Sequence, residues 1–165
     1  ASQVRQDLNC FGGFGQQGYG YNVSNLTGEI KRIMGIDRKH TIIIVGAGNI
    51  GHALTNFPGF AETGFEVKAL FDVNEDLIGT EIKGHPVLDV KDMDEYIREN
   101  QIDIGVIAAR RSAAQEIADR MCAAGIRGIW NFVPLDITTS VPIENVHLSE
   151  SLSTLSYKIE HGLLD

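Results

Sequence analysis

The residues best suited to chemistry in this sequence are a glycine-rich segment and one aspartate that follows it. Gly46, Gly48 and Gly51 have the spacing G-x-G-x-x-G, and Asp72 lies 21 positions after Gly51. Glycine at these positions allows a tight turn, a close approach of the backbone to a pyrophosphate, and close packing of the next helix. An acidic residue about 20 positions further on is placed to accept ribose hydroxyls. The spacing predicts dinucleotide binding; the alternative is a glycine turn that serves packing alone.

The motif requires a strand before it and a helix after it, and the sequence predicts both. The apolar, mostly β-branched run over 41–45 is typical of a buried parallel strand. A helix is expected from Ile50 to about Asn56, with its N-terminus towards the phosphates. Residues 65–71 predict a second strand, which ends at Asp72. Later strands are expected at 86–88, 103–109, 128–132 and 146–148, and helices at 93–100, at 112–124 and from about Ser151. This alternation predicts an α/β fold with a doubly wound parallel sheet.

Composition narrows the class of protein. The 165 residues are 43% hydrophobic and 22% charged, which are ordinary values for a globular protein. No apolar run approaches the roughly 18 residues that a membrane span needs. No signal peptide opens the chain, so we expect a cytoplasmic protein with no membrane partner. Cys10 and Cys122 lie in no C-x-x-C motif, which argues against a disulfide framework and a thiolate metal site.

The N-terminal part differs from the rest in charge and in pattern. Residues 1–40 hold five Lys/Arg and three Asp/Glu, a net charge of +2, whereas residues 41–165 hold nine and nineteen, a net charge of −10. This asymmetry predicts an N-terminal part suited to a polyanion. Residues 1–11 are expected to form a helix with side chains of base-contacting types on one face, namely Ser2, Arg5, Gln6 and Asn9. The alternative is the solvated face of an ordinary amphipathic helix.

Two further segments complete the pattern. Glycine alternates with aromatic residues over 11–21, which is typical of a tight hairpin beside a helix, although a flexible linker has the same composition. A short helix follows from about Ser24, and a charged linker over 37–40 places a domain boundary there. The last expected helix carries an apolar stripe of Leu148, Leu152, Leu155, Ile159 and Leu163. This stripe covers either the chain's own sheet or a partner chain.

Taken together, these segments resemble the Rex family of bacterial redox-sensing transcriptional repressors. The resemblance rests on the segments 2–8, 11–21, 46–54, 57–60, 123–129, 131–134 and 144–148. It covers essentially the whole chain, and the pairing of the first two segments with a dinucleotide motif is specific. The resemblance implies a partial winged-helix DNA-binding domain over 1–39, with recognition helix, wing and linker helix. It also implies an NAD(H)-binding Rossmann domain over 40–148 and a C-terminal dimerisation helix over 149–165, exchanged between subunits.

The resemblance also implies a function. A homodimer would repress transcription by binding operator double-stranded DNA, and would release that DNA when NADH rises relative to NAD⁺. Because the helices that normally precede the recognition helix are absent, we expect the chain to begin inside the DNA-binding domain. Ala109-Arg110 stands where the family commonly has Val-Pro.

Individual roles follow from the same resemblance. Ser2, Gln3, Arg5 and Gln6 would face the operator. The residues Gly46, Ala47, Gly48, Asn49, Ile50 and Gly51 would hold the pyrophosphate, and Asp72 with Val73 the adenosine ribose. The nicotinamide half would lie near Phe57, Ala108, Ala109, Asn131 and Phe132, and near His147 and Leu148 of the partner subunit.

Two other functions remain open on the sequence alone. An NAD-dependent oxidoreductase needs a substrate site and an acid/base of tuned pKa beside the nicotinamide. The five histidines show no pair with catalytic or metal-ligand spacing, so we expect no catalytic residue, no enzyme activity and no metal. The second alternative is a module that binds coenzyme A or another adenine nucleotide without redox sensing. Asp72 favours an unphosphorylated ribose, which disfavours NADP.

Overall fold

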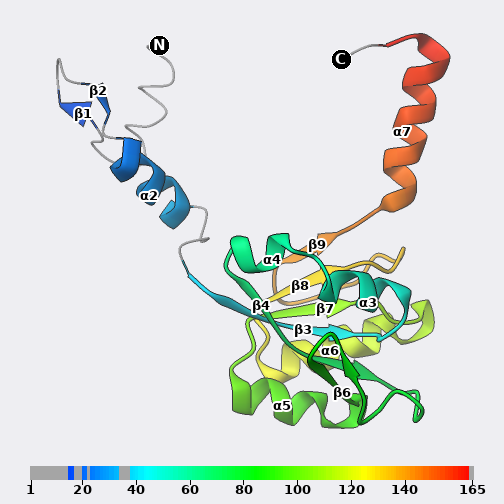
Figure 1. Ribbon diagram of the computed structural model, residues 1–165. Coiled ribbons are helices and arrows are strands. Elements are labelled where there is room, and N and C mark those ends of the chain that lie inside the picture. Colours follow the sequence, from blue (N-terminus) through cyan, green and yellow to red (C-terminus); the bar gives the residue numbers. More distant parts are fainter. Residues whose placement is uncertain (1–14, 17–19, 22, 34–37, 164–165) are drawn as a thin grey trace. The chain divides into compact units, whose positions relative to one another are not determined.

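The computed structural model describes residues 15–16, 20–21, 23–33 and 38–163, and the chain divides into two units, 1–39 and 40–165. In the first unit, the antiparallel strands β1 (Gly15–Gln16) and β2 (Gly20–Tyr21) form a hairpin before helix α2 (Val23–Ile33) (Figure 1). The hairpin agrees with the turn expected from the glycine-rich run. The helix expected over residues 1–11, with Ser2, Gln3, Arg5 and Gln6, lies outside the described residues.

The second unit is built on a seven-stranded sheet with the order β5-β6-β4-β3-β7-β8-β9. Its strands are β3 (His40–Val45), β4 (Phe65–Asp72), β5 (Glu81–Ile82), β6 (His85–Asp89), β7 (Ile104–Ile107), β8 (Gly128–Asn131) and β9 (Ile143–Asn145). The chain runs outwards from β3 through β4 to β6, then returns to the other side of β3 for β7, β8 and β9. This is the strand order of a doubly wound dinucleotide-binding sheet.

The sheet is mixed, whereas the sequence predicted only parallel strands. Every neighbouring pair is parallel except β5 and β6, which are antiparallel. Lys83 and Gly84 connect these two strands, with φ of 54° and 83°. Positive φ at both central residues is the geometry of a two-residue hairpin turn. Lysine is an unusual residue at such a position, so the sequence carried no clear hairpin signal here.

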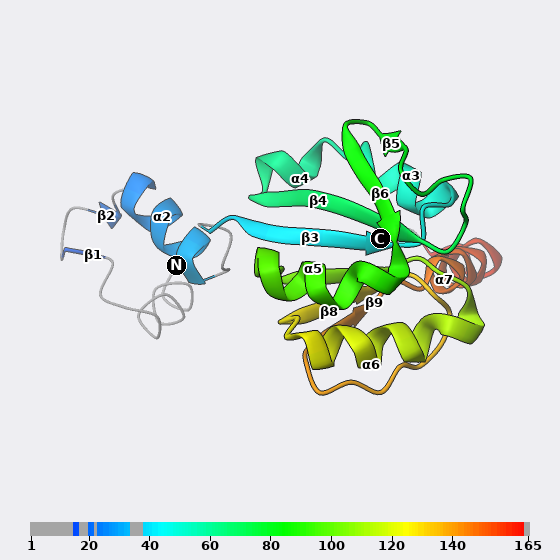
Figure 2. The same cartoon turned by 90° about the horizontal axis from the view of Figure 1, so that it is seen from below.

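Helices cover both faces of the sheet, as Figure 2 shows. Helices α3 (Asn49–Thr55) and α4 (Gly59–Glu62) lie on one face, and α5 (Met93–Asn100) and α6 (Ala114–Ala124) lie on the other. In β3, Ile42 and Ile44 pack into the first layer, and Ile43 and Val45 into the second. All four are at most 2% exposed. A strand buried on both faces needs an apolar side chain at every position, which explains the continuous apolar run.

The C-terminal part corrects one prediction. A last strand was expected over 146–148, but β9 ends at Asn145 and helix α7 (Leu148–His161) already begins at Leu148. The extended chain continues only to Val146, whose N–H donates to the Asn131 carbonyl at 2.8 Å. Leu148 belongs instead to the helical repeat that continues four residues later. Within the described part of the chain, no helix is long and apolar enough to span a membrane.

Candidate dinucleotide site

The glycine-rich segment forms the turn between β3 and α3, and its three glycines differ in what surrounds them. Gly46 has a φ of 108°, and a Cβ there would overlap the Ala108 carbonyl. A Cβ on Gly51 would overlap the Gly46 carbonyl, so Gly51 permits close packing of α3 on the turn. A Cβ on Gly48 would meet no atom within 4 Å. Gly46 and Gly51 are therefore required by packing, whereas Gly48 is open to a ligand.

Asp72, at the carboxyl end of β4, links the glycine-rich turn to the loop after its own strand. One carboxylate oxygen accepts the Ala47 N–H at 2.7 Å. The other accepts the N–H groups of Val73 at 2.8 Å and Asn74 at 2.9 Å. The Gly46 N–H also donates to the Phe71 carbonyl at 2.8 Å. These bonds place the carboxylate beside the turn, a role that its spacing did not reveal.

A cavity of about 800 Å³ opens between these residues, at the carboxyl edge of the sheet, and we call it the cofactor cavity. It is lined by Val45, Gly46, Gly48, Phe71, Asp72, Val73, Asn74, Leu77, Val90, Ala108, Ala109, Arg110, Ser112, Ala113 and Ile117. It lies at the point where the chain changes direction between β3 and β7, which is where open α/β sheets bind ligands. The structure thus brings together Gly46, Gly48, Asp72, Val73, Ala108 and Ala109 from the predicted set.

The lining also includes residues that sequence reasoning missed. Arg110 directly follows the expected strand 103–109, and Asn74 lies three positions after the expected strand 65–71, so a rule based on strand ends could have found them. Leu77, Val90 and Ile117 come from a loop, from the 3-10 turn after β6 and from α6. No local pattern marks these three apolar residues as cavity residues, because an apolar residue in the core has the same appearance in sequence.

Of the residues predicted for the nicotinamide half, Ala108 and Ala109 belong to this lining and the others lie outside it. Phe57 is 57% exposed and lines a second cavity of about 730 Å³. We call this the apolar cavity; its lining includes Ile42, Phe57, Phe60, Phe65, Trp130 and Ile143. Phe132 packs edge-on against Trp130, with ring centroids 4.6 Å apart. The two phenylalanines therefore lie along the face of the sheet that α3 and α4 cover.

Asn131, His147 and Leu148 are also placed away from the cofactor cavity lining. The Asn131 amide is fully buried; it donates to the Val133 carbonyl at 2.9 Å and the Asn145 side chain at 2.8 Å, and accepts the Val133 N–H at 2.9 Å. These bonds hold the loop after β8 against β9. His147 precedes α7, and its Nδ1 lies 3.8 Å from the Glu150 carboxylate. Leu148 is the first residue of α7.

The chemistry of the cofactor cavity suits binding. Asp72 is the one acid and Arg110 the one base among its described lining residues, and no histidine or cysteine joins them. Across the described residues, no group of three or more His, Cys, Asp or Glu side chains is placed to hold a metal. Gly48 is open for phosphate groups, and Asp72 offers carboxylate oxygens to ribose hydroxyls. This combination fits a dinucleotide with an unphosphorylated adenosine ribose.

Comparison with known proteins gives consistent results. A family model described as a CoA binding domain matches residues 37–135. The redox-sensing transcriptional repressor Rex of Clostridioides difficile (strain 630) is 52% identical over 164 residues, which cover 98% of this chain and 78% of that protein. Rex of Clostridium beijerinckii is 51% identical over the same shares of both chains. A crystal structure of the protein RSP in complex with beta-NAD⁺ and operator DNA has a TM-score of 0.90 and 48% identity, covering 98% of this chain and 75% of that one. RSP in complex with beta-NADH has a TM-score of 0.84 and 44% identity, covering 98% and 76%.

Proposed function

Because this chain belongs to the Rex family of redox-sensing transcriptional repressors, we propose that it binds NADH and NAD⁺ in the cofactor cavity and couples this binding to operator DNA. The relatives are repressors, and this chain is a transcriptional repressor rather than an enzyme. The observation that carries the cofactor proposal is the pairing of open Gly48 with the Asp72 carboxylate across one cavity. The pyrophosphate lies along the Gly46–Gly51 turn, where Asn49 and Ile50 offer backbone N–H groups, while the Ala47 N–H is bonded to Asp72, which holds the ribose.

DNA binding belongs to the first unit in this proposal. The β1–β2 hairpin and α2 support a winged-helix arrangement of residues 1–39, in which the hairpin is the wing. Ser2, Gln3, Arg5 and Gln6 would then face base edges in the major groove, because these residue types pair with bases there. The net charge of +2 over residues 1–40 suits a polyanion, and the net charge of −10 over the remainder does not. Residues 40–148 form the NAD(H)-binding domain.

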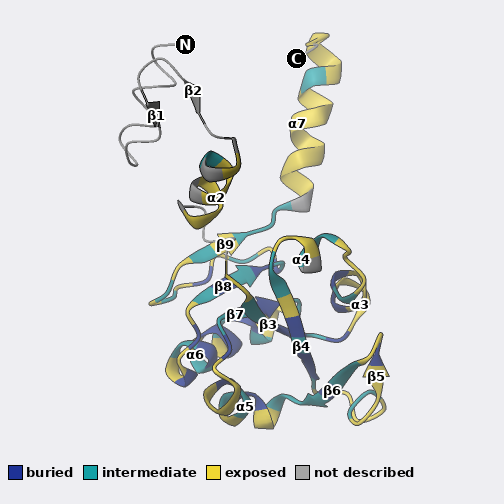
Figure 3. Cartoon of the chain, turned by 60° about the vertical axis from the view of Figure 1, so that its left-hand side comes forward, coloured by how far each residue is buried: buried dark blue, intermediate teal, exposed yellow. Residues whose placement is uncertain are grey.

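We also propose a homodimer held by the C-terminal helix, residues 149–165. Leu152, Leu155 and Ile159 form a stripe on α7, and Leu163 follows the end of this helix; these four residues are between 52% and 69% exposed. Figure 3 shows that most of α7 is coloured as exposed. The apolar cavity on the sheet is a second exposed apolar surface of the same chain. Two such surfaces are both covered when each subunit places its α7 against the partner's sheet, in a closed two-fold arrangement. His147 and Leu148, at the start of that helix, would then approach the partner's nicotinamide.

The sign of the response follows from the surroundings of the nicotinamide. In this proposal the nicotinamide end extends beyond the cofactor cavity lining towards Phe57 and Phe132, which are apolar. An apolar site prefers the neutral ring of NADH to the cationic ring of NAD⁺, because an unpaired charge is costly to bury. A ligand shifts a conformational equilibrium only through its different affinity for the two states. NADH therefore stabilises a dimer that has lost DNA affinity, and NAD⁺ opposes this change.

The test is a competition titration with the intact protein on a labelled operator, with NADH added at several fixed NAD⁺ levels. We expect NADH to release the DNA and NAD⁺ to shift the release to higher NADH. Gly48→Ala is the variant that should lose cofactor binding but keep the fold. A Cβ on this residue meets no protein atom within 4 Å, but it occupies the space proposed for phosphate. This variant should bind the operator with normal affinity, and NADH should not release it from the DNA. NADH that binds the protein without changing operator affinity would refute redox sensing.

The alternative of a coenzyme A module has one observation in its favour, the description of the matching family model. Both ligands contain adenine and a pyrophosphate, but coenzyme A carries a phosphate on its ribose. The Asp72 carboxylate would repel that group if the ribose binds beside it. Titration with coenzyme A in place of NADH separates the two functions, and we expect no release of DNA.

A further inference from the structure

Two loops contribute to the lining of the cofactor cavity, and we call them its two walls. The first wall is the segment after β4, with Val73 and Asn74; the second is the segment after β7, with Ala109, Arg110, Ser112 and Ala113. The lining also includes the apolar residues Leu77, Val90 and Ile117. Apolar lining residues suit a flat aromatic ring.

On the second wall, Arg110 has a fixed backbone and a side chain without a partner. Its carbonyl accepts the Ala113 N–H at 3.0 Å, and two residues earlier the Ala108 N–H donates to Val45 at 2.8 Å. Among the described residues, no hydrogen bond or ion pair involves its guanidinium, and the residue is exposed. Arg110 is also the one base among the described residues that line the cavity.

On the first wall, Val73 is an exposed apolar side chain. It is 71% exposed, the highest value among the exposed large hydrophobic residues of the described chain. Its backbone is nevertheless fixed, because its N–H donates to the Asp72 carboxylate at 2.8 Å. An apolar side chain held in water directly beside the acid proposed for the ribose is covered when a ring lies against it.

We propose that Arg110 sets the affinity for the adenine end of the cofactor, by stacking its guanidinium on the adenine ring that Val73 contacts from the other side. The inference rests on the proposed binding of NADH. With the ribose at Asp72, the adenine attached to it lies beside Val73, between the two walls. A guanidinium is planar and stacks on aromatic rings, whereas the ammonium of lysine has no flat face. The stack adds cation–π attraction to apolar contact.

The test measures binding of NADH, NAD⁺ and ADP-ribose by calorimetry to the intact protein and three variants. Arg110→Gln and Arg110→Lys should each weaken all three ligands by the same factor, about three- to tenfold, because the adenine is common to them. Arg111→Gln is the matched control. It removes the same charge from an exposed neighbouring residue that does not line the cavity. It should leave all three affinities unchanged. Thermal unfolding of each variant confirms that the fold is kept.

Each other outcome overturns the stacking role. Full affinity in Arg110→Lys with loss in Arg110→Gln would mean that Arg110 acts through charge alone, on a phosphate. Unequal losses between NADH and ADP-ribose would place Arg110 near the nicotinamide. Unchanged binding in both variants would remove Arg110 from the site. Absence of NADH binding in the unaltered protein would instead contradict the proposed function, so the two failures are distinguishable.

Discussion

Asp72 has two roles: its carboxylate holds the backbone around the glycine-rich turn, and we propose that it also binds the ribose. Its carboxylate accepts three backbone N–H groups, from Ala47, Val73 and Asn74. These bonds tie the glycine-rich turn to the following loop. Each carboxylate oxygen has further lone pairs that can accept ribose hydroxyls. A preformed site of this kind loses less conformational entropy when the cofactor binds.

Removal of the Asp72 carboxylate should therefore weaken cofactor binding and loosen the turn. Asp72→Ala should weaken NADH binding by roughly 1–3 kcal/mol, the effect of losing charge-assisted hydrogen bonds. Its melting temperature should also fall, because three N–H groups lose their acceptor. Calorimetric titration measures the first effect. The control is Asp76→Ala, which removes the same charge from the same loop at a residue that does not line the cofactor cavity. It should change neither the NADH affinity nor the melting temperature. Unchanged NADH affinity in Asp72→Ala would exclude Asp72 from the site.

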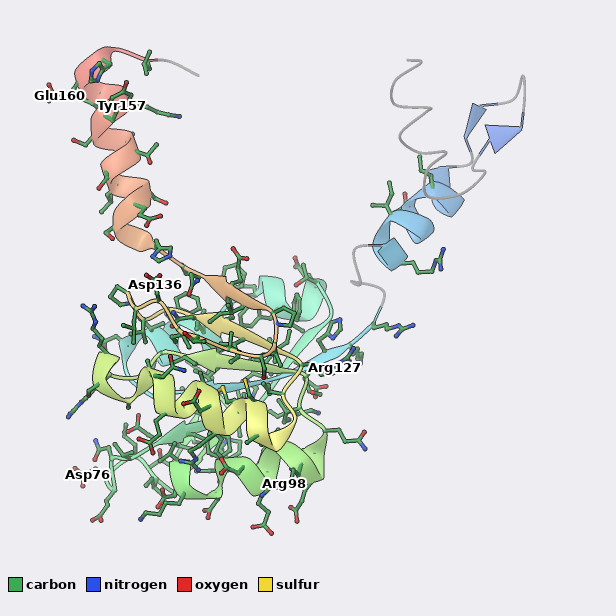
Figure 4. The ribbon with its side chains drawn as sticks, turned by 180° about the vertical axis from the view of Figure 1, so that it is seen from behind. Asp76, Arg98, Arg127, Asp136, Tyr157 and Glu160 are labelled. Atoms are coloured by element: carbon green, nitrogen blue, oxygen red, sulfur yellow. The ribbon has the colours of Figure 1, made fainter. Side chains whose placement is uncertain are left out.

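A second charged residue, Asp103, directly precedes β7, at the end of the sheet opposite to the carboxyl ends of the strands. Figure 4 shows Asp76 and Arg127 on opposite sides of this unit. The Arg127 guanidinium donates to one Asp103 oxygen at 2.7 Å, and the Thr41 N–H donates to the other at 3.2 Å. Partial burial raises the pKa of Asp103, but these hydrogen bonds and the nearby charges lower it more, so the net pKa lies below the ordinary value of 3.8.

A lowered carboxyl pKa stabilises the fold above the unfolded value, and this stabilisation is lost as the pH falls through the lower folded value. Between about pH 7 and about pH 3, the free energy of unfolding should therefore fall less in Arg127→Ala than in the unaltered protein. Urea unfolding at several pH values measures this. Arg98→Ala removes an exposed arginine at the same end of the sheet and should keep the original pH dependence. An identical pH dependence in Arg127→Ala would contradict this role for the pair.

At the scale of elements, α7 is a helix whose apolar stripe the described part of this chain leaves uncovered. Leu152 is 68% exposed and Ile159 is 69% exposed, whereas the apolar positions Ile117 and Met121 of α6 are 6% and 0% exposed. Both helices have an apolar stripe in sequence. The difference is that α6 lies on the sheet and α7 does not, which is why we assign its stripe to a second subunit.

Charges placed on the α7 stripe should dissociate the proposed dimer. Burial of an apolar side chain of this size contributes about 1.5–3 kcal/mol, and an unpaired carboxylate in its place adds a further cost. Leu152→Asp with Leu155→Asp should give monomers in sedimentation experiments at micromolar concentration. Ser153→Asp with Thr154→Asp adds the same charges away from the stripe and should leave the dimer intact. A monomeric unaltered protein would refute this interface.

At the scale of the whole molecule, the proposed switch depends on two subunits acting together. A dimer reads two half-sites only when its recognition elements have the correct separation, so a change in the angle between subunits weakens both contacts at once. A shift in population from about 1:99 to 99:1 requires roughly 5.5 kcal/mol of differential binding. Two bound cofactors supply this more readily than one.

We therefore expect full release of DNA to require NADH in both subunits. A heterodimer with one Gly48→Ala subunit, isolated with two affinity tags, should release the operator only partly at saturating NADH. The unaltered homodimer should release it fully, with a Hill coefficient above 1, and the homodimer of the variant should not release it. A heterodimer that responds like the unaltered homodimer would show that one cofactor is sufficient.

The sequence by itself determined the parts of this protein that depend on local pattern. The apolar run before Gly46 predicted the central strand because a strand buried on both faces needs an apolar residue at each position. The spacing of Gly46, Gly48, Gly51 and Asp72 predicted the turn and the acid beside it, because both lie at the ends of adjacent strands. The resemblance of the whole chain to the Rex family predicted the family to which it belongs.

Only the tertiary structure decided which residues meet. One cavity brings together four residues that are distant in sequence: Leu77, Val90, Arg110 and Ile117. They meet because β6 and β7 lie on opposite sides of the β3–β4 pair. No local sequence pattern encodes that arrangement. The same holds for Phe57, which lies in the apolar cavity, and for the amide of Asn131, which bonds to Asn145 14 residues later. A strand was expected at 146–148 and a helix is found from Leu148, because a short apolar segment at a boundary fits either period and its pattern alone does not choose between them.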